Sequence, residues 1–140
     1  MPFFKLPVSF PIAACRRLAV LLLCCLLTGC GEAPPPLVPV TGKVVLSDGS
    51  PVTRGSISFH PDTANSYQKD DPSSLLQVDG SFTMKTFPFG EGVPPGKYKV
   101  TLSPDLAGRI RHPEYGLPAK TPWKIEVTEA GVADHTFEVN

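Results

Sequence analysis

From Val40 onward, this chain is built on short segments in which apolar and polar residues alternate, with glycine or proline between them. The alternating segments are residues 40–46, 56–60, 76–84, 97–102, 123–127 and 136–139. A period of two is typical of β-strands that bury one face. The 17 prolines among 140 residues argue against long uninterrupted helices, and no segment has sustained helical periodicity. Many short strands separated by turns predict a β-sandwich or a β-barrel.

One of these segments predicts a β-hairpin around Asp79-Gly80. A two-residue loop would place Leu76 and Phe82 on opposite faces of the hairpin. A three-residue loop that begins at Val78 pairs Leu76 with Phe82 and keeps both side chains inward. It also puts Gly80 at the position that requires a left-handed backbone. We therefore expect the three-residue loop.

The N-terminal region has the layout of a secretory signal. An uncharged apolar run extends from Leu18 to Leu27 and follows Arg16 and Arg17. A basic region followed by about ten apolar residues and then small residues is typical of such signals. A permanent transmembrane helix needs about 20 apolar residues, so this run is too short to serve as one.

The run ends in Leu27-Thr28-Gly29-Cys30, which resembles the lipobox of bacterial lipoproteins. The resemblance implies that Cys30 receives diacylglycerol, that the bond between Gly29 and Cys30 is then cleaved, and that the new N-terminus is acylated with a chain such as palmitate. The protein would then contact the membrane through this lipid. Gly31, in place of an aspartate, resembles the outer-membrane sorting preference of Gram-negative lipoproteins. We therefore expect an exported protein anchored in the cell envelope at the outer membrane; the alternative is an ordinary signal peptide with a chance cysteine.

Cleavage would divide the chain into a signal peptide (1–29), a lipidated cysteine with a proline-rich spacer (30–37) and a β-sandwich domain (38–140). The spacer contains three consecutive prolines and is expected to be extended and semi-rigid. Only Cys30 of the four cysteines would remain, so we expect no disulfide. The mature chain would keep ten basic and thirteen acidic residues without a basic run, which predicts no nucleic-acid partner.

Several turn and strand motifs recur along the domain. They are Val40-Thr41-Gly42-Lys43-Val44, Asp48-Gly49-x-Pro51-Val52, Gly55-x-Ile57, Phe59-x-Pro61, Asp79-Gly80-Ser81-Phe82 and Gly92-Val93-Pro94-Pro95-Gly96-Lys97-Tyr98. Together they resemble the carboxypeptidase-regulatory-like domain, a transthyretin-like β-sandwich, over residues 38–140 and most weakly across 104–122. The resemblance implies an antiparallel Greek-key sandwich of about seven strands. Family members serve as accessory or binding modules, and the regulatory domain is not the catalytic part.

Residues that carry chemistry form no familiar pattern in the sequence. His60, His112 and His135 lie on separate segments without zinc-site spacing, and we expect them to be solvated surface residues. A Ser-His-Asp triad could be assembled only from distant serines, because no Gly-x-Ser-x-Gly motif is present. Asp70 and Asp71, with Asp62, lack the ligand spacing of a calcium loop, which favours a polar loop. We expect no catalytic residue, no metal site and no cofactor.

Residues 61–74 and 104–122 carry no strand pattern, and loops of this length are often functional. The candidate binding residues in the second loop are Arg109, Arg111, His112 and Tyr115. An aromatic platform for sugars or peptides could be formed by Trp123 and Tyr115 with Phe87 and Phe89. The alternation of Trp123 with Ile125 and Val127 instead favours a core position for the tryptophan, while Tyr115 fits either role.

These observations favour a lipid-anchored β-sandwich that acts as a non-catalytic binding or structural module in the cell envelope. Its expected partners are an envelope protein or a polysaccharide, in addition to the membrane. Two alternatives remain open: an envelope hydrolase with an unrecognised site, and a small-ligand carrier by analogy with transthyretin. Analogy of fold alone is weak support for the carrier.

Overall fold

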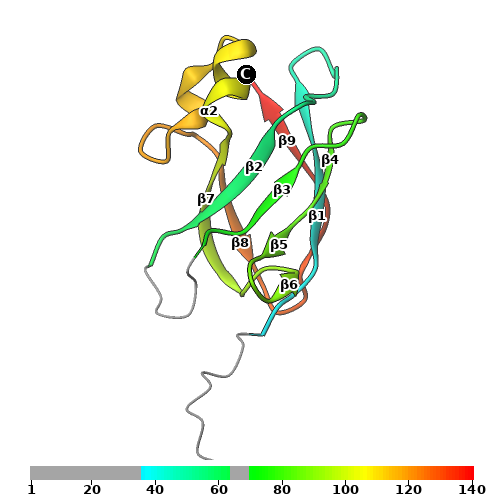
Figure 1. Ribbon diagram of the computed structural model, residues 1–140, viewed down its shortest axis with the longest axis vertical. Coiled ribbons are helices and arrows are strands. Elements are labelled where there is room, and N and C mark those ends of the chain that lie inside the picture. Colours follow the sequence, from blue (N-terminus) through cyan, green and yellow to red (C-terminus); the bar gives the residue numbers. More distant parts are fainter. Residues whose placement is uncertain (1–35, 64–69) are drawn as a thin grey trace, which may run out of the picture. The chain divides into compact units, whose positions relative to one another are not determined.

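The computed structural model describes residues 36–63 and 70–140. The predicted signal peptide, the cleavage site at Gly29 and the lipidated Cys30 lie outside the described residues. The described part forms two β-sheets that face each other, with one short α-helix at one end (Figure 1). This arrangement confirms the predicted all-β sandwich.

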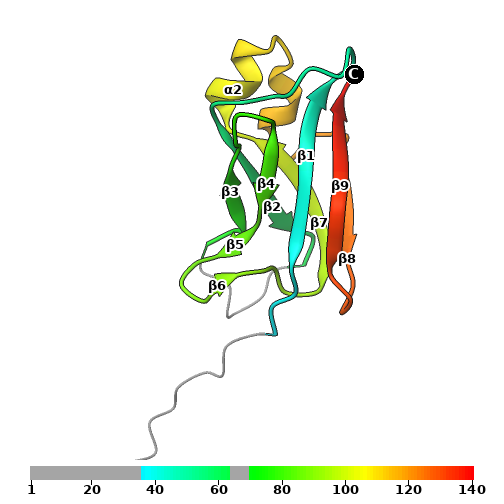
Figure 2. The same ribbon diagram turned by 90° about the vertical axis from the view of Figure 1, so that its right-hand side faces the viewer.

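The smaller sheet has three strands in the order β4–β1–β9, and the larger sheet has six in the order β6–β5–β3–β2–β7–β8. Figure 2 shows the two layers edge-on. The strands of the smaller sheet are β4 (Ser81–Thr83), β1 (Val40–Leu46) and β9 (Val132–Val139). Those of the larger sheet are β6 (Gly90–Glu91), β5 (Lys85–Thr86), β3 (Ser73–Leu75), β2 (Ser56–Pro61), β7 (Gly96–Leu102) and β8 (Lys124–Val127). The described residues thus form nine strands, two of them with only two residues, where about seven were expected.

The pairing of β1 with β9 is parallel, which corrects the prediction of an antiparallel sandwich. Val40 pairs with Val132 at one end of the two strands, and Leu46 pairs with Val139 at the other. The other ladders are antiparallel. Because β1 and β9 are the first and last strands, the chain between them supplies the long connection that a parallel pair requires.

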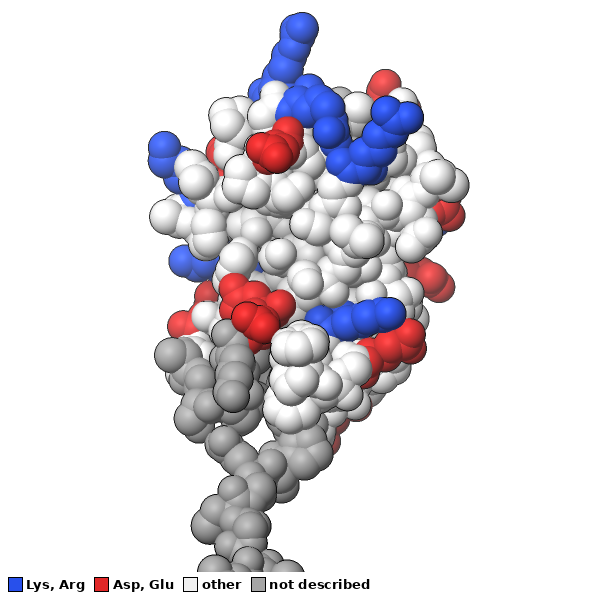
Figure 3. Space-filling model, viewed as in Figure 1, with Lys and Arg blue, Asp and Glu red and all other residues white. Residues whose placement is uncertain are grey.

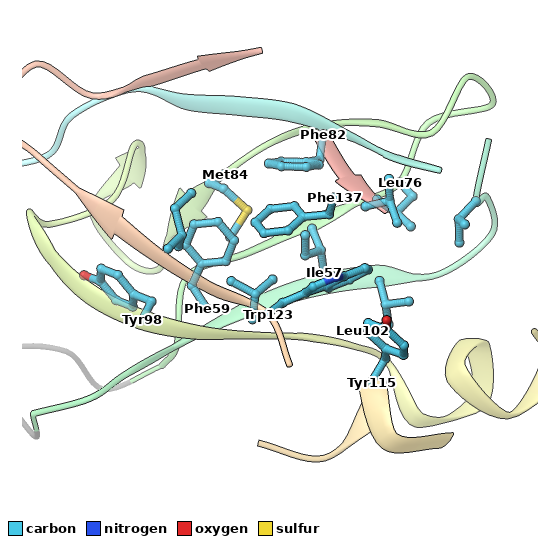
Figure 4. Packing of buried hydrophobic residues seen from close by; sticks show 14 of the residues in the cluster. Ile57, Phe59, Leu76, Phe82, Met84, Tyr98, Leu102, Tyr115, Trp123 and Phe137 are labelled. Carbon is cyan, nitrogen blue, oxygen red and sulfur yellow. The ribbon is translucent and has the colours of Figure 1, made fainter. Parts of the chain in front are cut away.

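The core lies between the sheets and follows the alternation seen in the sequence. Ile57 and Phe59 of β2 are fully buried, and their polar neighbours point away. Phe59 meets Phe82 of β4 edge-on at 6.5 Å between ring centroids and Phe137 of β9 at 6.3 Å (Figure 4). Aromatic rings in this geometry contribute beyond their buried area. The two sheets are therefore joined through one aromatic cluster.

The predicted three-residue loop of the hairpin is confirmed. Gln77 donates its N–H to the carbonyl of Ser81 at 2.9 Å, and Gly80 donates to the carbonyl of Gln77 at 3.0 Å with a φ of 78°. Leu76 and Phe82 are consequently both buried. The two arms then separate, because β3 pairs with β2 in the larger sheet and β4 pairs with β1 in the smaller one.

Residues 104–122, which carry no strand pattern, contain the helix α2 (Pro104–Arg109) and the 3₁₀ helix η1 (Pro113–Gly116). The expectation of an irregular loop was therefore wrong for these residues. Both elements have proline in the first turn, where it costs no hydrogen bond. Each is too short to give a recognisable 3.6-residue period.

Candidate functional site

The candidate binding residues gather at the end of the sandwich where β1 and β9 both finish. Arg109 ends α2, Arg111 and His112 form the connection to η1, and Tyr115 lies in η1. Both arginines are exposed and His112 is half-buried. Tyr115 is only 2% exposed, so it belongs to the core and not to an open aromatic platform.

Tyr115 connects the helical end to the sandwich. Its ring packs edge-on against Trp123 at 4.5 Å between centroids. The backbone N–H of Asn140 donates to the Tyr115 hydroxyl at 3.2 Å. Trp123 is buried with Ile125, as the alternation predicts, and its indole N–H donates to a carbonyl of β9. The surface around Arg109 therefore rests on a firmly packed support.

The chain leaves α2 through a Schellman motif, in which two backbone bonds close the helix end. The N–H of Arg111 donates to the carbonyl of Gly108 at 3.1 Å, and that of His112 donates to Ala107 at 2.9 Å. The motif needs a left-handed residue, usually glycine, and here Arg111 takes it with a φ of 65°. A side chain in this conformation costs about 1 kcal/mol or more.

His112 is held by its neighbours in this turn. Its Nδ1 lies 3.0 Å from Oε1 of Glu114, and its ring meets that of Tyr115 edge-on. A bond from the backbone N–H of Glu114 itself and the contact with His112 lower the pKa of the Glu114 carboxyl. The glutamate thus stays ionised beside the imidazole at neutral pH.

The loop between β1 and β2 also contributes to this end of the sandwich. Nη2 of Arg109 donates to the carbonyl of Thr53 at 3.3 Å and more closely to that of Arg54. Gly55 allows the loop to approach α2, since a Cβ there would lie 2.5 Å from Leu106 Cδ2. Arg54 is exposed and has a φ of 61°. Sequence reasoning missed Arg54 because 55 residues separate it from Arg109, and the only local signal is Gly55, a residue type typical of turns and close approaches.

We define Arg54, Arg109, Arg111 and His112 as the basic pole. Its three arginines are the only arginines of the sequence after residue 30. Among the described residues, none of the three forms an ion pair with a carboxylate. Figure 3 shows basic side chains gathered at the α2 end, with acidic groups more frequent toward the opposite end. The three arginines of the pole are therefore clustered cations with hydrogen-bond donors that no described residue uses, apart from Nη2 of Arg109.

A second constellation lies on the outer side of the larger sheet. His60 Nδ1 contacts Asp71 Oδ2, and its Nε2 lies 2.7 Å from the Thr101 hydroxyl. A carboxylate, an imidazole and a hydroxyl follow one another in the order of a hydrolase triad. Thr101, however, is only 4% exposed, so a substrate cannot reach its hydroxyl. His60 is thus a bridging residue rather than a freely solvated one.

A groove of about 600 Å³ opens where the arms of the hairpin separate. We call it the side groove; it is lined by Ser73, Ser74, Leu75, Gln77, Thr83, Lys85, Phe87 and Glu91. Leu75 and Phe87 are 73% and 71% exposed, while Lys85 and Glu91 pair with each other at 4.0 Å. The sequence did not reveal this groove, because it arises when β3 and β4 join different sheets.

No family model, curated protein or solved structure matches the chain. The resemblance to carboxypeptidase-regulatory-like domains accordingly stays a prediction. In the part of the chain that the structure describes, no helix is long and apolar enough to cross a membrane. The same residues contain no group of three or more histidine, cysteine or acidic side chains that could hold a metal ion.

Proposed function

We propose that this protein is a lipoprotein of the cell envelope, anchored through Cys30, and that its β-sandwich is a non-catalytic binding module. Support for the anchor comes from the signal-like N-terminus and the lipobox-like Leu27-Thr28-Gly29-Cys30. Support for the binding role comes from the basic pole, whose arginines have no carboxylate partner among the described residues.

The observation that carries the proposal is the position of the basic pole relative to the start of the domain. Val38 bridges to Val93 just before β1, and the pole lies beyond the other end of that strand (Figure 1). Seven residues of β1 span about 23 Å at roughly 3.3 Å each. The chain therefore enters the domain at the end of β1 opposite to the basic pole, which leaves the pole clear of the point of entry.

A hydrolase is the second candidate, because Asp71, His60 and Thr101 are aligned. The burial of Thr101 opposes this role, and none of the residues that line the side groove belongs to this constellation. Nucleophilic catalysis requires a hydroxyl that a substrate can approach. The binding role is therefore the better supported of the two.

The anchor is tested by palmitate labelling of the protein in the cells that produce it. Cys30→Ala should abolish the label and release the protein from the envelope fraction. Cys25→Ala is the matched control, because it removes a cysteine from the same region without changing the lipobox-like motif. Label that persists in Cys30→Ala would contradict the anchor.

A further inference from the structure

We propose that the basic pole binds an acidic polysaccharide, with its arginine side chains contacting carboxylate groups on the sugars. This inference rests on the proposed binding role and names the class of partner. It begins from the unpaired cations: a guanidinium carries five N–H donors in a flat fork that fits a carboxylate. Only Nη2 of Arg109 is used within the described residues, on the carbonyls of Thr53 and Arg54.

The backbone of the pole is fixed before any ligand arrives. Arg54 and Arg111 both have left-handed backbones, a conformation that usually selects glycine. Non-glycine residues in such conformations persist where surrounding structure enforces them, and they concentrate at binding sites. Here the Schellman bonds enforce Arg111, and the close approach of Gly55 to Leu106 holds the loop that carries Arg54. Because the backbone is fixed, binding would order only the arginine side chains and not the loops that carry them.

Polar groups beside the arginines are suited to hydrogen bonding with a sugar chain. A hollow of about 320 Å³ lies beside Arg54 and is lined by Thr53, Gln77 and the hairpin residues Leu76 and Val78. Hydroxyl and amide groups can hydrogen-bond to sugar hydroxyls. The exposed aromatic residues of the described part, Phe87 and Phe89, follow β5 near the opposite end of the sandwich (Figure 1), so recognition at the pole would rest on charge and hydrogen bonds.

The cations are also distributed in a way that suits a polymer. Arg54 comes from the loop before β2, Arg109 from the end of α2 and Arg111 from the turn that follows it. The three guanidiniums thus come from two segments of the chain that meet at this end, an arrangement suited to successive charges along a polymer. A single small anion would instead be bound where donors converge in one pocket.

The test measures binding of polygalacturonate to the protein purified in non-ionic detergent from the cells that produce it, at low salt, with neutral dextran as the comparison. The variant Arg54→Gly/Arg111→Gly removes two cations at positions that suit glycine, so its melting temperature should not fall. The matched control is Lys97→Gln/Lys124→Gln, which removes two exposed cations from β7 and β8. We expect polygalacturonate to bind, the arginine variant to lose about tenfold or more in affinity, and the lysine variant to bind nearly as the parent.

Four results would overturn the inference: no binding of polygalacturonate, equal binding of dextran, equal losses in the two variants, or tighter binding of a DNA oligonucleotide. An unfolded arginine variant is recognised by its melting temperature; Arg54→Gln/Arg111→Gln then replaces it, and the same losses are expected. Failure here leaves the palmitate result untouched, and failure of palmitate labelling leaves this binding measurement untouched.

Discussion

The basic pole and the side groove are both exposed surfaces that a ligand could use, and they are built in opposite ways. At the pole the three arginines form no ion pair among the described residues, and the aromatic residue, Tyr115, is buried beneath the pole. In the side groove Lys85 pairs with Glu91, and Phe87 is left exposed. Cations that have no carboxylate partner within the protein remain available to attract an anionic partner. The comparison therefore favours the pole as the site of charge recognition.

The largest expected effect is a difference in stability between variants of two aromatic residues, Tyr115 at the pole and Phe87 in the side groove. Tyr115→Ala should lower the free energy of unfolding by about 3 kcal/mol, because it removes a buried ring packed on Trp123. Phe87→Ala is the matched control and should change it by about 0.5 kcal/mol or less, since that ring is mostly in solvent. Urea denaturation measures both values. Equal losses in the two variants would mean that the pole does not rest on the core as described.

A smaller effect distinguishes two arginines within the pole. Arg109→Gly should lower the free energy of unfolding by about 1 kcal/mol, because glycine is unfavourable in a helix and the bonds to Thr53 and Arg54 are lost. Arg111→Gly should leave it unchanged or raise it by about 0.5 kcal/mol, because glycine suits the left-handed position. Thermal unfolding of the pair is the measurement. A loss in Arg111→Gly as large as that in Arg109→Gly would refute the left-handed placement of Arg111.

What the sequence predicts well is local. The alternation of Ile57 and Phe59 identifies the buried face of β2, and the turn chemistry of Asp79-Gly80 identifies the three-residue loop of the hairpin. Periodicity also assigns Trp123 to the core. Each of these features depends on residues that are close together in the chain, so residue type and spacing are enough.

What the sequence does not reveal depends on contacts between distant segments. The parallel pairing of β1 with β9 joins the two ends of the domain, and no local signal encodes its direction. Arg54 reaches the pole only because Gly55 allows its loop to approach α2. The side groove exists only because β3 and β4 join different sheets. Packing decides all three features, and packing cannot be inferred from the alternation of side chains.

The most direct test of the account asks whether the basic pole is covered in the envelope itself. Phenylglyoxal modifies accessible arginines, and mass spectrometry reports the extent at each position. We predict that Arg54 and Arg111 react slowly in envelope vesicles that contain the lipidated protein, and that they become reactive when the protein is purified in detergent. Adding polygalacturonate to the purified protein should restore the protection. Equal reactivity of these arginines in vesicles and in detergent would contradict an anchored module whose basic pole engages an anionic partner.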